Sequence, residues 1–120
     1  MNSQYNILSY LSYDRTRALV QVFDGWKHLI NEFYDELEKH NNCNMNDKIF
    51  VTEVKQKWGI LRIYYTPSHK NIDNIYSIIQ KKSLHTCEIC GAYGNFIDKE
   101  HWSYILCNIH TNINPPDYFI

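Results

Sequence analysis

The sequence lacks a long apolar run, a secretory signal and an excess of charge. No apolar run approaches the roughly 18 residues that a membrane span requires. Residues 1–14 have neither a basic start nor the uninterrupted apolar stretch of a signal peptide. Twelve basic and 13 acidic side chains leave a formal net charge of −1, which excludes bulk attraction to nucleic acid or to anionic membrane. We therefore expect a cytoplasmic protein without a membrane partner.

Familiar catalytic patterns are missing as well. No Gly-rich phosphate loop, Ser-His-Asp arrangement or pair of facing carboxylates stands out. The chain also has no internal repeat and no linker long enough to separate domains. Its 120 residues are 44% apolar and 15% aromatic, which is the composition of a folded protein and not of a disordered chain. These features predict one folded domain over residues 1–120 and no enzyme.

Hydrophobic periodicity predicts two helices and a hairpin. Six apolar side chains recur at the helical period and form one stripe: Trp26, Leu29, Ile30, Phe33, Tyr34 and Leu37. Asp24 is predicted to be the N-cap of this helix. From residue 48 the period changes to two, which predicts strands over residues 48–54 and 60–65 joined by a turn at Gly59. Residues 71–84 again have the helical pattern.

The N-terminal residues are less informative. Residues 5–13 weakly favour a short helix or a turn-rich arm, and residues 15–23 fit either a helix or an extended segment. Together with the C-terminal cysteines described next, the predicted order is amphipathic helix, β-hairpin, second helix and zinc knuckle. This order predicts the α+β class.

Cysteine and histidine occur near the C-terminal end at the spacing of metal ligands. Cys87 and Cys90 form a CxxC pair, and Cys107 and His110 form a CxxH pair. Thiolates and imidazole suit zinc, and four protein ligands close its tetrahedron, so a structural zinc is predicted in a module over about residues 85–112. A thioredoxin-like redox pair would leave two of these ligands unexplained. Cys43 is predicted to be a free loop thiol and is given no role.

A catalytic alternative exists on the same scaffold. Nucleases of the His-Asn-His type can be built on two zinc knuckles, and they need a further His beside an acidic residue to activate water. His85 and His101 are the candidates, and residues 98–101 contain the required residue types. The loop over residues 95–102 is too short for a separate ββα active site, so a zinc-dependent nuclease is the least favoured interpretation.

Two surfaces are candidates for binding a partner. Basic and aromatic residues alternate in the predicted hairpin: Lys55, Lys57, Trp58, Arg62 and Tyr64. Such a face can bind a protein or single-stranded nucleic acid, although solvated strand residues with Trp58 in the core are the simplest interpretation. The predicted first helix carries the acidic residues Glu32, Asp35 and Glu36, which either form a solvated face or contact a basic partner.

Three stretches together resemble a small family in bacteria and their phages. They are FDGW at residues 23–26, VKQKWGILRIYY at residues 54–65, and TCEICGA at residues 86–92 with LCNIH at residues 106–110. Members of that family carry a DGW helix start, a KFGGLRFY-like hairpin and a CEVCG knuckle followed by LCxxH. This chain has Trp58 and Ile60 where the pattern has Phe and a second Gly. The resemblance spans about residues 22–112.

The resemblance implies an architecture and a bacterial or phage setting, and it supplies no catalytic residue. Small accessory proteins in that setting are often inhibitors, such as immunity proteins against toxins or phage proteins that block host defences. The favoured hypothesis is a non-enzymatic, zinc-stabilised protein that binds and inhibits a macromolecule, most of all a protein. A nucleic-acid-binding regulator that uses the basic and aromatic hairpin is the alternative.

Overall fold

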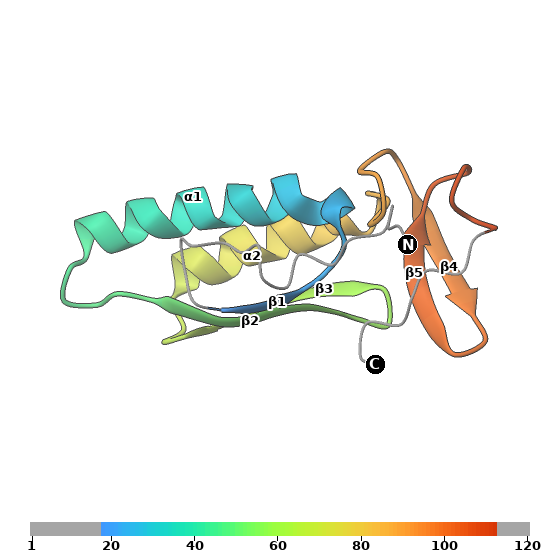
Figure 1. Cartoon of the computed structure of the whole chain (residues 1–120). Helices are drawn as coiled ribbons and strands as arrows, with labels where there is room; N and C mark the ends of the chain where they lie inside the picture. Colours follow the sequence, from blue (N-terminus) through green and yellow to red (C-terminus); the bar gives the residue numbers. More distant parts are fainter. Residues whose placement is uncertain (1–17, 113–120) are drawn as a thin grey trace.

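A computed structural model of the chain describes residues 18–112, which form an α+β fold (Figure 1). The short helix or arm predicted for residues 5–13 lies outside these residues. The elements in order are β1 (Leu19–Gln21), the 3₁₀ turn η1 (Asp24–Trp26), α1 (Lys27–Cys43), β2 (Phe50–Lys57), β3 (Ile60–Thr66), α2 (Lys70–Ser83), β4 (Asn95–Lys99) and β5 (Trp102–Leu106). Neither α1 nor α2 is long and apolar enough to cross a membrane.

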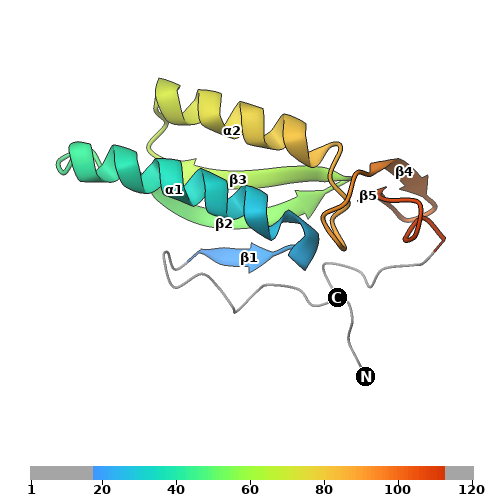
Figure 2. The ribbon, with the colours of Figure 1, turned by 90° about the horizontal axis from the view of Figure 1, so that it is seen from above.

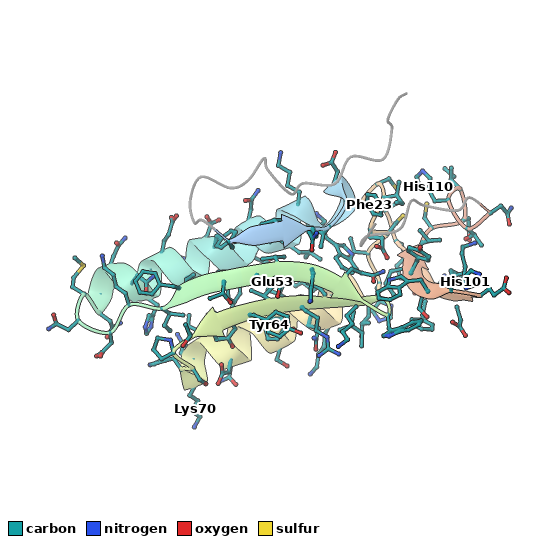
Figure 3. The ribbon with its side chains drawn as sticks, turned by 60° about the horizontal axis from the view of Figure 1, so that its bottom comes forward. Phe23, Glu53, Tyr64, Lys70, His101 and His110 are labelled. Carbon is teal, nitrogen blue, oxygen red and sulfur yellow. The ribbon has the colours of Figure 1, made fainter. Side chains whose placement is uncertain are left out.

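Two helices cover one face of a three-stranded sheet. The strand order is β1-β2-β3, with β1 parallel and β3 antiparallel to β2. Helices α1 and α2 run side by side over the sheet (Figures 1 and 2). Figure 3 looks onto the opposite sheet face, which no described helix covers and on which Glu53 and Tyr64 are labelled. The two-stranded sheet β4-β5 lies beyond the tip of the β2–β3 hairpin (Figure 1).

The stripe predicted for the first helix is the core of the molecule. All six of its apolar side chains are buried, which confirms the amphipathic helix. The prediction that Asp24 caps this helix is wrong, because α1 begins only at Lys27 and its N-cap residue is Trp26. Asp24 instead begins the turn η1, in which the Gly25 N–H donates to the Glu88 carbonyl at 2.9 Å. A distant part of the chain therefore fixes the helix start.

Strand β2 departs from strict alternation at Thr52. The pairing with β3 shifts register between Val51 and Glu53, so both Val51 and Val54 are buried. An extra residue in one strand of a pair reverses the faces of all residues after it. Beyond the bulge, Glu53 and Lys55 consequently lie on the open face.

The hairpin turn uses two residues with positive φ, Trp58 at 53° and Gly59 at 83°. Such two-residue turns match the twist of the strands, and the prediction that Gly59 supplies the unusual dihedral angle is confirmed. A bulky residue such as Trp rarely adopts this conformation. The side chain of Trp58 is 49% exposed, so the interpretation that places it in the core is wrong.

Helix α2 covers part of the free edge of β3. The Tyr76 hydroxyl donates to the Leu61 carbonyl at 2.9 Å, and the Gln80 amide donates to the same oxygen at 3.1 Å. Gln80 also donates to the Tyr76 hydroxyl at 2.9 Å. Occupied backbone groups cannot template another strand, so these side chains protect the edge from intermolecular pairing.

Candidate metal centre

The four predicted ligands lie together at the C-terminal end. Cys87 and Cys90 follow α2, whereas Cys107 and His110 follow β5, and their ligand atoms lie within 4.8 Å of one another. Cys90 Sγ is 3.7 Å from Cys107 Sγ, and Cys87 Sγ is 3.6 Å from His110 Nδ1. Cys107 Sγ and His110 Nδ1 are 3.2 Å apart. The group can hold a metal ion, and the predicted grouping is confirmed.

Tight turns aim each cysteine pair at the same point. In the first pair the Gly91 N–H donates to the Cys87 carbonyl at 2.8 Å, and Gly91 has a φ of 86° that favours glycine. In the second pair the His110 N–H donates to the Cys107 carbonyl at 3.1 Å. The two turns therefore present their ligands in the same local manner, and we call them the first and second knuckle.

The protein environment acts on the two buried thiols in opposite directions. Burial raises the pKa of the Cys87 thiol to about 11, although the N–H groups of Cys90, Cys107 and Ile89 favour its thiolate. Burial also disfavours the thiolate of Cys107, but the His110 N–H and the Cys90 thiol outweigh it and lower the pKa to about 7. A bound cation favours thiolates at both positions, because a coordinated thiol loses its proton.

A buried carboxyl group ties the first knuckle to the rest of the fold. Glu88 is fully buried, and its carboxyl accepts hydrogen bonds from the Ile105 N–H at 2.8 Å and from the Gln56 amide at 3.1 Å and 3.2 Å. Burial raises the pKa of Glu88 to about 8, against the effect of the bonds from Ile105 and Gln56. The Glu88 backbone N–H also donates to the Ile105 carbonyl at 2.9 Å. The knuckle is thus joined to β5 and β2.

Gln56 extends this connection to the second hairpin. It is fully buried on β2, and its amide also donates to the Ser103 carbonyl at 2.8 Å. Its side-chain oxygen accepts a hydrogen bond from the Trp102 indole. Neither Glu88 nor Gln56 was predicted, because their partners are far apart along the chain. The available signals were a Gln two residues after Val54, where the alternation of the strand places another inward-facing side chain, and a Glu between two ligands.

Gly25 and Trp26 hold the other side of the first knuckle. A Cβ atom at Gly25 would lie 2.2 Å from the Cys87 carbonyl oxygen and 2.4 Å from the Glu88 carbonyl carbon. The Trp26 indole donates to the Thr86 carbonyl at 2.8 Å. Residues of η1 and of β2 therefore both contact the first knuckle, although they are far from it along the chain.

The histidines considered for catalysis do not form a site with the metal ligands. His101 lies at the β4–β5 turn beside Glu100, with 3.8 Å between ring nitrogen and carboxylate and both side chains 86% exposed. His85 stacks on Tyr93 with ring centroids 5.9 Å apart. Within residues 18–112, no second cluster of three or more metal-ligating side chains is found. Residues 95–102 consist of β4, the turn at Glu100 and His101, and the first residue of β5.

Two cavities lie elsewhere in the described structure. One, of about 640 Å³, is lined by α1 and the start of β2, including Tyr34, Leu37 and Phe50. The other, of about 230 Å³, lies between the end of α1 and the segment that precedes α2, and His40 and His69 are among its lining residues. His69 Nδ1 accepts a hydrogen bond from the Asn71 N–H and so caps α2. Because Nδ1 accepts this capping hydrogen bond, His69 has a structural role at the start of α2.

The candidate binding residues of the hairpin share the open sheet face. Lys55 and Arg62 are cross-strand neighbours, and Lys55 Nζ lies 5.8 Å from the ring centroid of Tyr64. Lys55 also pairs with Glu53 at 3.4 Å. Within the described part of the chain, Arg62 Nε has no hydrogen-bond partner. Lys57 and Trp58 continue this surface to the hairpin tip.

The acidic face of α1 is partly neutralised. Glu32 pairs with Lys82 at 2.9 Å and Glu36 with Lys39 at 3.3 Å, while Asp35 is exposed. Cys43 is also exposed, but it lies in the last turn of α1 and not in a loop. Ion pairs on the same surface reduce the negative field that a basic partner would meet. The acidic face is consequently the weaker of the two candidate surfaces.

Comparison of the chain with family models, with curated proteins and with solved structures found no match.

Proposed function

We propose that this chain is a non-enzymatic, zinc-stabilised protein that binds another macromolecule, most of all a protein, and inhibits or neutralises it. The proposal places it among toxin-immunity or phage anti-defence proteins of the bacterial cytoplasm. The observation that carries it is the pairing of a closed ligand cluster with a sheet face that no helix within residues 18–112 covers and that carries Arg62, Tyr64 and, at the hairpin tip, Trp58. The cluster stabilises the fold, and the uncovered face is available to a partner.

Zinc is the metal that best fits the ligand group. Tetrahedral zinc, with Zn–S distances of about 2.3 Å and Zn–N distances of about 2.0–2.1 Å, places two sulfurs about 3.8 Å apart and sulfur and nitrogen about 3.6 Å apart. The separations of 3.7 Å for Cys90–Cys107 and 3.6 Å for Cys87–His110 agree with these values, whereas that of 3.2 Å for Cys107–His110 is shorter. Three thiolates and one imidazole also disfavour Mg²⁺ and Ca²⁺, which prefer oxygen ligands.

The same ligand group argues for a structural role of the ion. Catalytic zinc sites keep one position open for water or substrate, whereas four protein ligands fill the tetrahedron. The ion would hold the two knuckles together. The residues around the ion would then act only by positioning β5 and β2, as in the hydrogen bonds that Ile105 and Gln56 donate to Glu88.

The proposed function is tested with purified zinc-loaded protein. It is used as bait in a bacterial host lysate, each captured protein is purified, and its activity is measured with increasing amounts of the chain. We expect a captured enzyme or toxin to lose its activity at one equivalent. If metal-dependent cleavage of plasmid DNA by the chain itself is found and is abolished by His101→Ala, the chain is a nuclease and the proposal falls.

A nucleic-acid-binding regulator is the second candidate, because exposed Trp58 follows Lys57 directly and shares the β2–β3 hairpin with Arg62. Aromatic side chains stack on bases, and nearby cations contact phosphates. A gel shift that persists at moderate salt and weakens in Arg62→Ala would favour this candidate. We expect no such shift, since the net charge of −1 leaves only local attraction.

A further inference from the structure

We propose that the partner is a protein with an acidic and partly apolar surface, and that it docks on a composite surface built by both β-hairpins. This docking surface consists of Lys57, Trp58, Ile60, Arg62, Phe96 and Trp102. The inference rests on the proposed function and names its binding site and the chemistry of its partner. Two of its three aromatic residues, Phe96 and Trp102, come from β4 and β5 of the C-terminal module, which was not predicted to bind a partner.

The aromatic part of the docking surface spans two modules. Trp58, in the β2–β3 turn, stacks on Trp102 of β5 with ring centroids 4.4 Å apart and an interplanar angle of 23°. Phe96 of β4 lies against the same turn, since a Cβ atom at Gly59 would be 3.0 Å from its ring. Trp58 and Phe96 are 49% and 54% exposed. Large aromatic side chains at neighbouring, half-exposed positions are typical anchors of protein interfaces.

The backbone at Trp58 gives an independent indication. Its φ of 53° lies in the left-handed region, where Gly or Asn would fit without strain. Hairpin geometry alone therefore does not call for a Trp, and a half-exposed side chain does not fill the core. Strained conformations of bulky residues concentrate at functional sites. We infer that this position presents the indole to a partner.

The charged part of the docking surface attracts carboxylates. Glu53 pairs with Lys55, whereas Lys57 is exposed and half-buried Arg62 makes no ion pair within residues 18–112. Arg62 Nε is buried, so a carboxylate would have to approach the terminal nitrogens of the guanidinium group. Lys57 of β2 pairs with Ile60, and Arg62 of β3 pairs with Lys55. The two cations therefore lie on the same face of the sheet, on adjacent strands. A guanidinium group matches a carboxylate in geometry as well as in charge. A partner with an Asp or Glu next to an apolar side chain complements this surface.

The same charges argue against nucleic acid as the occupant. Nucleic-acid binding gains most of its affinity from several phosphate contacts. The docking surface offers two cations, Lys57 and Arg62, on a chain with a net charge of −1. Trp and Arg are, in contrast, among the residues that contribute most to protein–protein binding.

The experiment uses three defined probes on the zinc-loaded full chain. They are a short peptide of alternating Glu and Leu, the same peptide with Lys in place of Glu, and a short oligothymidylate. Amide chemical shifts and tryptophan fluorescence are recorded during each titration. We expect only the acidic peptide to shift the amides of residues 57–62 and 96–102. Arg62→Ala and Trp58→Ala should each weaken its binding about tenfold.

Matched controls lie on α2. Lys81→Ala removes an exposed cation and Ile78→Ala an exposed apolar side chain, and neither should change binding. If Trp58→Ala does not fold, as judged by loss of dispersion in its amide spectrum, Trp58→Asn is used in its place. Asn is tolerated at the left-handed backbone conformation of this turn. Binding of oligothymidylate instead of the acidic peptide overturns the proposal in favour of a nucleic-acid surface. Failure of every probe to shift these amides overturns it as well.

The failure of this inference differs from the failure of the proposed function. A captured and inhibited partner whose binding is unchanged by Arg62→Ala and Trp58→Ala would place the interface elsewhere and leave the function standing. A chain that inhibits no captured protein would remove the proposed function, whatever the peptide titrations show.

Discussion

At the scale of single residues, Gly25 is required by a close contact. The space that a Cβ atom would need is occupied by the backbone of Cys87 and Glu88, at 2.2 Å and 2.4 Å. Backbone atoms beside a metal ligand cannot move away without displacing that ligand. Gly25→Ala should therefore destabilise the zinc-loaded chain by about 3 kcal/mol, as measured by chemical denaturation. Ser77→Ala, at an exposed position of α2, is the control. Equal stability of both variants would show that the backbone of Cys87 and Glu88 moves to accommodate the added methyl group.

The carboxyl of Glu88 should matter through its acceptors and not through its charge. The Ile105 N–H and the Gln56 amide donate to it in a buried environment. Glu88→Ala leaves the Ile105 N–H without a partner and the Gln56 amide with only the Ser103 carbonyl, which should cost about 2–3 kcal/mol of unfolding free energy. Glu88→Gln keeps a carbonyl acceptor and nearly the same volume. We expect it to lose less than half as much, and an equal loss in both variants would mean that the charge itself is needed.

At the scale of elements, a carboxylate at the start of α2 anchors this helix to β3. Asp73 accepts hydrogen bonds from the Tyr65 hydroxyl and from the Ser68 hydroxyl, the latter at 3.0 Å. These bonds, that from Tyr65 above all, lower the pKa of Asp73 below its ordinary value of 3.8. The folded state thus binds fewer protons than the unfolded state, and stability rises with pH through this range.

The Asp73 contribution should be present above pH 3.8 and lost as the pH falls through the lower pKa of the folded state. Asp73→Asn should therefore be less stable than the parent chain at neutral pH, and the difference should disappear in acid. Urea denaturation of both chains over a pH series measures it. Because both chains carry the same metal site, the acid release of metal cancels in the difference. A constant difference down to acid pH would contradict the mechanism.

Local patterns predicted the elements, and long-range contacts decided their details. The stripe of α1 and the CxxC and CxxH spacings depend on residues within a few positions, so both could be read from the sequence. Strand β1 has three residues and pairs in parallel with a strand more than 30 positions away, at Val20 and Val54. The bulge at Thr52, the helix start at Gly25 and the Gln56–Glu88 bond likewise depend on distant partners, and no local pattern signals them.

At the scale of the whole molecule, the group of four candidate metal ligands adjoins the main core. Cys87, Ile105 and Leu106 are buried in the same apolar cluster as Trp26 and the residues of α1. A metal site at the edge of a fold would release only its own loop on metal loss. Here the knuckles contact η1 through Gly25 and β2 through Gln56, so the loss of the ion should propagate to both helices.

Removal of zinc should therefore lower the thermal midpoint of the entire chain in one transition. Structural zinc contributes on the order of 10 kcal/mol of binding free energy in small peptides, and that energy is available only to the folded state. Circular dichroism at the helical signal, recorded with and without a strong chelator, measures the effect, and tryptophan fluorescence reports the Trp58–Trp102 stack. Cys107→Ser should behave like the chelated chain, whereas Cys43→Ser, at an exposed free thiol, should melt like the parent. Unchanged helical melting after chelation, with loss of only the Trp signal, would show that the knuckles unfold separately and that the hydrogen bonds of Gln56 and Gly25 do not couple them to the helices.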